Sequence, residues 1–154
     1  MRALTTLGVL LCVCGGRGAA AQLVSPATSG AMHGAIQAAD REATVWFGLL
    51  RDDRARDAWN RAAPHFRQRI NRETFERTWS LHTGRLQPVV ARRVTAIRYV
   101  VAAPPDRPEL VVFDTRVEFR GGTFGGETVT LALGDGVWRV WEYSVAPGSN
   151  PRDR

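Results

Sequence analysis

The chain has 154 residues, of which 44% are hydrophobic and 23% charged, and its 21 basic and 15 acidic residues leave a formal net charge of +6. This length suits a single ordinary domain, and this composition excludes a disordered chain and a fibrous repeat. Every basic residue is an arginine, and along the helical region the arginines alternate with acids, as in the stretch 51–57. A nucleic-acid-binding protein would concentrate one sign of charge on one face, so we expect no nucleic-acid partner.

Residues 1–21 have the three parts of a secretory signal peptide. Arg2 provides the positive start, Leu4–Val13 an apolar stretch, and Ala19–Ala21 a small-residue cleavage site before Gln22. The apolar stretch is shorter than the roughly 20 residues that a membrane-spanning helix needs. We therefore expect cleavage, export to the periplasm or beyond the cell, and no stable membrane span.

Both cysteines, Cys12 and Cys14, belong to this signal segment. A lipidated cysteine needs a small residue before it, whereas these two follow leucine and valine, so loss with the signal is the favoured interpretation. The mature chain would then have no disulfide, and its hydrophobic core alone must stabilise it. Beyond the signal, we expect a flexible leader over residues 22–32, one domain over 33–146 and a disordered tail over 147–154.

Three helices are predicted in the first half of the domain. Apolar residues recur at three- and four-residue steps from Ile36 to Leu50 and again, more briefly, from Ala55 to Ala62. Pro64 ends or kinks this second helix. The third helix runs from a plausible N-cap at Asn71 to Gly84.

Beyond residue 88 the apolar period changes from 3.6 to 2, which predicts strands. The four strands expected are Val94–Ala103, Leu110–Arg120, Glu127–Leu133 and Val137–Val145, the last two joined by a tight turn at Asp135-Gly136. Helices followed by strands with short turns indicate an α+β domain, here three N-terminal helices packed on a curved four-stranded antiparallel sheet.

The order of several short motifs resembles a bacterial domain-of-unknown-function family, number 4019, of small exported proteins. The motifs are Trp59-Asn60-Arg61-Ala62-Ala63, Ile70 to Phe75, Pro105-Asp106 with Glu109, Glu127-Thr128-Val129-Thr130-Leu131, and Asp135-Gly136-Val137-Trp138-Arg139-Val140 ending at Tyr143. The resemblance implies helices on a curved antiparallel sheet, similar to the nuclear-transport-factor-2-like (NTF2-like, or cystatin-like) superfold. That superfold hosts enzymes, binding modules and dimerisation units, so it does not decide the function.

Acid–base catalysis is the sharper of two functional hypotheses. His65 or His82 facing Asp114 or Glu118 across the mouth of the domain would make a small isomerase or hydrolase, since histidine titrates near neutrality. No nucleophile–base pair or oxyanion motif accompanies these residues, so catalysis is the alternative reading. The histidines are too far apart along the chain for a zinc site, and we expect no metal and no cofactor.

The favoured hypothesis is a non-catalytic exported module. It would bind a small apolar ligand or an envelope protein, or act as a homodimerisation unit. Its ligand-pocket candidates are Trp59, Trp79, Tyr99 and Phe113. Trp138 and Trp141 are expected on opposite faces of one strand, and Trp138 with Val140 are candidates for an interface on the open sheet face.

Overall fold

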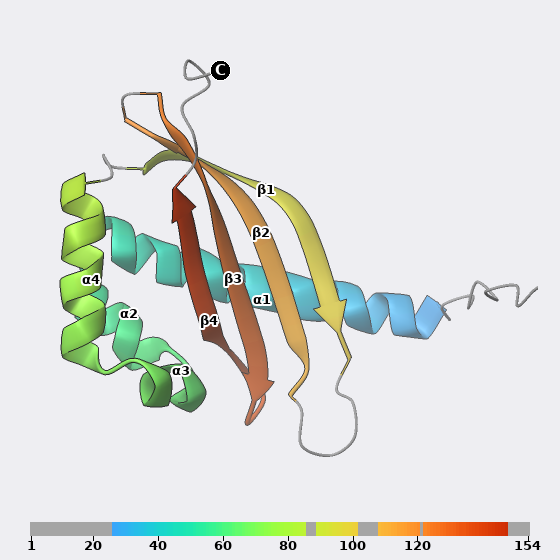
Figure 1. Cartoon of the computed structure of the whole chain (residues 1–154). Coiled ribbons are helices and arrows are strands. Elements are labelled where there is room, and N and C mark those ends of the chain that lie inside the picture. Colours follow the sequence, from blue (N-terminus) through green and yellow to red (C-terminus); the bar gives the residue numbers. More distant parts are fainter. Residues whose placement is uncertain (1–25, 86–88, 102–107, 121, 148–154) are drawn as a thin grey trace, which may run out of the picture.

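A computed structural model of the chain describes residues 26–85, 89–101, 108–120 and 122–147. Four helices precede four strands, so the α+β class is confirmed (Figure 1). The expected signal segment, and the expected tail apart from Pro147, lie outside the described residues. The elements are α1 (Pro26–Arg51), α2 (Ala55–Arg61), α3 (Pro64–Arg69), α4 (Arg72–Arg85), β1 (Val89–Val100), β2 (Leu110–Phe119), β3 (Phe124–Gly134) and β4 (Val137–Pro147).

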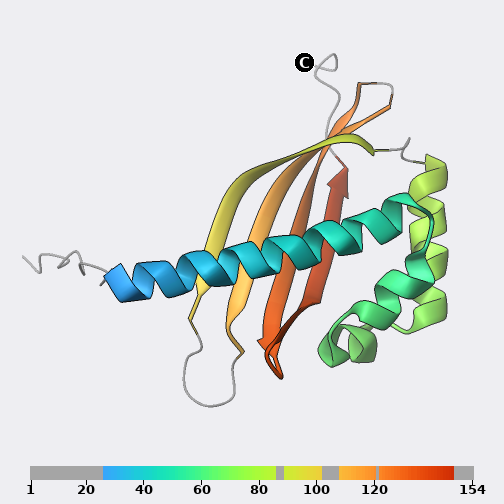
Figure 2. The same cartoon turned by 180° about the vertical axis from the view of Figure 1, so that it is seen from behind.

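The four strands form one antiparallel sheet in the order β1-β2-β3-β4. Helix α1 runs across one face of the sheet, and helices α2 to α4 gather beyond the β4 edge (Figures 1 and 2). The alternation of β2 sends Val111, Phe113 and Val117 toward α1, where they are buried, and leaves Asp114 and Arg116 on the other face. No described helix covers that other face, which we call the open face.

Helix α1 packs against the sheet through the apolar stripe that the sequence predicts. Ala39, Ala43, Trp46 and Leu50 recur at three- and four-residue steps and are each at most 4% exposed. The helix begins at Pro26, inside the segment 22–32 expected to be a flexible leader. Proline is favoured at the first helical position, because the missing N–H would have no partner there.

A fourth helix, α3, corrects the expected number of three. Pro64 does end α2, but it also occupies the first turn of α3, where its fixed φ suits a helix start. The Ala63 N–H donates to the Val140 carbonyl oxygen at 2.8 Å, which docks the start of α3 on the free edge of β4.

Two strands begin earlier than predicted, because a charged residue or a glycine interrupts the alternation of apolar and polar residues there. Strand β1 begins at Val89 and not at Val94. The pattern misses its first residues because Arg92 occupies an inward position, where an apolar residue is expected, and pairs there with Glu127. Strand β3 begins at Phe124, and Gly125 belongs to it: a Cβ there would lie 2.9 Å from the Ala146 carbonyl oxygen. Close packing thus requires glycine at this position. The Asp135-Gly136 turn is as predicted, with φ of 52° and 74°.

A register shift between β3 and β4 falls at Trp141. Leu131 of β3 pairs with Val140 and Thr130 pairs with Glu142, so Trp141 has no partner on β3. Such a bulge interrupts the simple alternation of faces. Trp138 and Val140 precede the bulge and face the core, because they pair with the inward residues Leu133 and Leu131. The Trp141 ring stacks on His65 of α3, with 3.9 Å between the ring centroids.

Candidate functional site

Two charged residues and a tyrosine form a buried network between α1 and the sheet. The Arg92 Nε donates to Glu127 Oε2 at 2.8 Å, and the Tyr143 hydroxyl donates to Glu127 Oε1 at 2.8 Å. The side chains of Arg92 and Glu127 are only 21% and 2% exposed. The Arg92 guanidinium also lies over the ring of Phe47 of α1, 4.6 Å from its centroid. The network thus joins α1, β1, β3 and β4.

This network satisfies its own polar atoms. Both oxygens of Glu127 accept hydrogen bonds, and two nitrogens of Arg92 donate to it. A carboxylate so enclosed and so fully paired is poorly placed to take a proton from a substrate. Its effect on the site is mechanical, since it fixes the ring of Tyr143, which forms one wall of a cleft.

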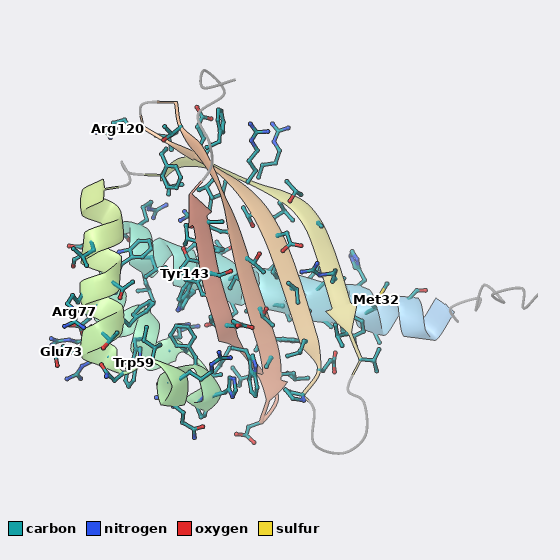
Figure 3. All side chains as sticks on the ribbon, viewed as in Figure 1. Met32, Trp59, Glu73, Arg77, Arg120 and Tyr143 are labelled. Carbon is teal, nitrogen blue, oxygen red and sulfur yellow. The ribbon has the colours of Figure 1, made fainter. Side chains whose placement is uncertain are left out.

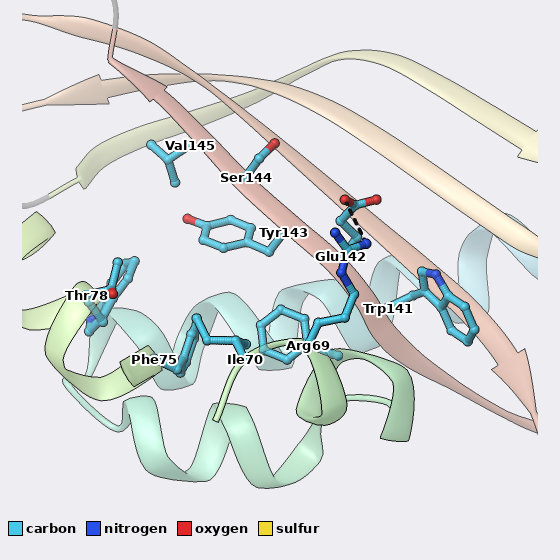
Figure 4. Close-up of a pocket in the computed structure, with 11 residues that line it drawn as sticks. Arg69, Ile70, Phe75, Thr78, Trp141, Glu142, Tyr143, Ser144 and Val145 are labelled. Carbon is cyan, nitrogen blue, oxygen red and sulfur yellow. Dashed lines mark ion pairs between the residues drawn. The ribbon is translucent and has the colours of Figure 1, made fainter. Parts of the chain in front are cut away.

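That cleft lies between helices α3 and α4 and strand β4, and it encloses about 310 Å³ (Figure 4). Its walls are largely aromatic and apolar. They are formed by Phe66, Ile70, Phe75, Trp79, Trp141, Tyr143 and Val145. In Figure 3 the labelled Tyr143 projects from the sheet toward the helices beside it.

The polar groups of the cleft lie at its rim. Arg69 of α3 and Glu142 of β4 approach each other at 3.8 Å, and both side chains are more than half exposed. A pair this long and this exposed contributes little to stability, so either partner is available to a ligand. Thr78 and Ser144 add hydroxyl groups. The cleft can therefore hold an apolar body and contact one polar end.

A second, more polar cleft of about 320 Å³ separates α1 from β1 and β2. Arg92 and Thr115 contribute to its floor, and Asp40 and Arg51 of α1 to its walls. Both arginines are already paired, Arg92 with Glu127 and Arg51 with Asp52 at 3.0 Å. Asp40 is then the one lining charge without an ion-pair partner among the described residues, and a single carboxylate does not make a specific binding site.

The residues of the acid–base hypothesis lie on different surfaces. His65 is on α3, stacked on Trp141, whereas Asp114 and Glu118 belong to the open face of the sheet. Asp114 accepts a hydrogen bond from Thr128 and pairs with Arg98. Within the described ranges no hydrogen bond or ion pair joins His65 to either carboxylate. The side chain of His82 lies outside the described residues.

Two of the four pocket candidates line a cleft in the structure and two do not. Trp79 lines the α4–β4 cleft, and Phe113 lines the more polar cleft under α1. Trp59 instead donates its ring N–H to the Ile70 carbonyl oxygen at 2.8 Å, and the Tyr99 hydroxyl donates to Glu109. Neither of these two residues lines either cleft.

The two interface candidates are in the hydrophobic core. Trp138 and Val140 are 7% and 0% exposed, so they offer no surface to a partner. The network of Arg92, Glu127 and Tyr143 was not among the candidates. Its one sequence signal is Glu127, an acid on the strand face that otherwise carries Val129, Leu131 and Leu133.

In the described part of the chain, no three histidine, cysteine or acidic side chains are grouped to hold a metal ion. None of the described helices combines the length and the hydrophobicity needed to cross a membrane.

The two tyrosines of the chain predict an unusual alkaline titration. The hydrogen bond to Glu109, with some help from burial, raises the pKa of Tyr99 to about 12. Burial first, and then the charge of Glu127, raise the pKa of Tyr143 still further. Since an ordinary tyrosine titrates near pH 10, the native protein should show little tyrosinate absorbance at about pH 11, where the urea-unfolded chain is mostly ionised.

The raised pKa values also predict how the stability of the fold changes with pH. Because both folded-state pKa values are raised, the stabilisation linked to these phenols is complete below about pH 10 and falls as the pH rises toward 12. A Tyr143→Phe variant isolates Tyr99 and should titrate with a midpoint near 12. A native midpoint near 10 for either tyrosine would contradict these hydrogen bonds.

Together, the fold and site define a small α+β domain with an aromatic cleft between its helices and one edge of an open antiparallel sheet. The family model described as "Protein of unknown function (DUF4019)" matches residues 42–143, more than half of the chain. The chain therefore belongs to this family, as its motifs predict. A comparison with curated proteins finds no match.

Proposed function

We propose that this protein is a non-catalytic binding module for a small, largely apolar ligand, and that the α4–β4 cleft is its site. One observation carries the proposal: seven apolar or aromatic side chains line a cleft of about 310 Å³ whose charged groups stay at the rim. This volume is at the small end of the range for ligand pockets, and the arrangement of an apolar body with few polar groups is typical of them.

The supporting network favours binding over chemistry. Tyr143 is the one wall residue with a titratable group, and its hydroxyl is engaged by Glu127. The rim pair of Arg69 and Glu142 would orient a charged end of the ligand by exchanging partners. A flat aromatic acid is thus a suitable probe, because its ring would contact the aromatic walls and its carboxylate Arg69.

The test fills the cleft without disturbing the core. Thr78 is an exposed residue of α4 that lines the cleft, so a Thr78→Trp variant should fold and occlude it. Gln68→Trp is the matched control, since Gln68 is exposed and uncharged and does not line the cleft. Titration calorimetry with 2-naphthoate should show binding to the native protein and to Gln68→Trp, weakened about tenfold or more in Thr78→Trp.

Native mass spectrometry of the protein from its own cells complements this titration. Extra mass that Gln68→Trp retains and Thr78→Trp loses would identify the natural ligand class. Equal 2-naphthoate affinity in all three proteins, or no binding to any, would rule out the cleft as the site.

We also propose that the protein is exported after removal of residues 1–21 and acts in the periplasm or outside the cell. The charged start, short apolar stretch and alanine-rich cleavage site support this proposal. An N-terminus at Gln22 in protein isolated from the cell envelope is the result expected for this cleavage.

We further propose that the domain is related to the NTF2-like superfold. The long helix across a curved antiparallel sheet supports this relationship.

A further inference from the structure

In the part of the chain that the structure describes, no helix or strand covers the edge of the sheet at β1. Eight large hydrophobic side chains of the described residues are exposed, and five of them lie in β1 or directly after it: Val90, Val94, Ile97, Val100 and Val101. The opposite edge differs, because the N–H of Ala63 bonds to β4 and the other helices lie beside it. Register shifts interrupt the first half of β1, but from Ala96 to Val100 the strand pairs regularly with β2, and an exposed regular edge of this kind is a template for pairing with another strand.

Helix α1 extends beyond this edge. Its 26 residues span about 39 Å, whereas four strands place their outer axes only about 14 Å apart. Figures 1 and 2 show that the excess projects past β1, and Figure 3 places Met32 in the projecting part. Ala35 and Ile36, partly buried against the core, continue an apolar stripe toward that end. A fifth strand beside β1 would therefore be covered by α1 on its helix-facing side.

The charges on the open face of this edge are basic. Arg93 lies directly opposite Arg116 of β2, and it has no ion-pair partner among the described residues. Like charges placed directly opposite each other destabilise a sheet. Arg98 on the same face pairs with Asp114, its one ion-pair partner among the described residues, at 3.1 Å and with 60% of the arginine side chain exposed. An acidic neighbour would relieve this repulsion.

The helix-facing side of β1 is different. Val94 is paired with Thr115 and Ile97 with Phe113, both buried residues of β2, yet these two side chains are 46% and 47% exposed. An added strand with apolar residues on this side would bury them. A second copy of the chain would instead bring Arg93 and Arg98 of both copies to one shared edge.

We propose that β1 accepts an extended segment of a partner protein as a fifth strand. The segment has acidic side chains on the side of Arg93 and Arg98, and apolar side chains on the side of Val94 and Ile97, under α1. This site lies at the edge opposite the proposed ligand cleft and is independent of it. The backbone of β1 provides affinity, and the alternating side chains provide the specificity.

The test uses two synthetic peptides of about eight residues, a usual strand length, alternating valine with either glutamate or lysine. The native protein should bind the glutamate peptide and discriminate against the lysine peptide by about tenfold or more. Ile97→Glu should abolish this preference and weaken binding of the glutamate peptide by about tenfold. The matched control is Val137→Glu at the other edge, where the valine is 45% exposed, and it should bind as the native protein does.

A charge reversal distinguishes the loss of the binding site from the misfolding of a variant, because it should create a new preference and not only remove one. In the double variant Arg93→Glu with Arg98→Glu, the preference should switch to the lysine peptide. Absence of binding, or equal binding of both peptides by the native protein, would overturn the proposal. So would a dimer in sedimentation analysis that Ile97→Glu dissociates, since a second copy would then occupy the edge.

Discussion

Replacing Arg92 with methionine is expected to lower the free energy of unfolding by about 3–5 kcal/mol. The change leaves the Glu127 carboxylate, which is 2% exposed, with the Tyr143 hydroxyl as its remaining partner in the network. A buried charge without its counter-ion retains its desolvation penalty and loses the Coulombic attraction that offset it. Urea unfolding of native and variant protein with equal m-values provides the measurement.

Two further variants separate this effect from the loss of any arginine. Arg98→Met removes an arginine from the same strand, but its partner Asp114 is 29% exposed, so a loss of at most about 1 kcal/mol is expected. Adding Glu127→Gln to Arg92→Met removes the unpaired charge while keeping an acceptor for Tyr143, so most of the lost stability should return. Equal costs for Arg92→Met and Arg98→Met would show that the network is not a buried ion pair.

Replacing Trp46 with alanine is expected to cost about 3–5 kcal/mol. Trp46 is the largest fully buried side chain, and it packs at the centre of an aromatic cluster with Phe66, Phe75 and Tyr143. Its ring N–H also donates to the Ala58 carbonyl oxygen at 3.1 Å, which holds α1 against α2. Alanine would leave a cavity and a weakened wall for the ligand cleft, and the Ala58 carbonyl would lose one of its two described donors, keeping the Ala62 N–H.

The Trp46→Phe variant keeps most of the ring and loses the hydrogen bond. Chemical unfolding should show a smaller loss, of about 0.5–1.5 kcal/mol, because the Ala58 carbonyl loses this donor but still accepts from the Ala62 N–H. Trp141→Ala is the comparison for a tryptophan outside the cluster, because Trp141 is half-buried and stacks on His65 alone among the described rings. If Trp141→Ala costs as much as Trp46→Ala, the hydrophobic core is centred elsewhere than between α1 and the sheet.

The site was less predictable than the fold, for reasons visible in particular residues. Trp79, one of the pocket candidates, lies on the apolar face of α4 and lines the aromatic cleft. Tyr143 was missed, since its role depends on Glu127, 16 residues away, and on the register of β4. Trp138 was assigned to a surface because simple alternation ignores which face the helices cover.

The sequence by itself determined the class of the fold, the family, the buried stripe of α1 and the Asp135-Gly136 turn. Each of these depends on residues a few positions apart, whose spacing sets one helix face, one strand face or one positive φ. Only the tertiary structure decided that Arg92 turns inward to Glu127, 35 residues away, and that the bulge at Trp141 sends it to His65. These contacts depend on how distant segments pack, because an inward charge is tolerated only where its partner is already in place.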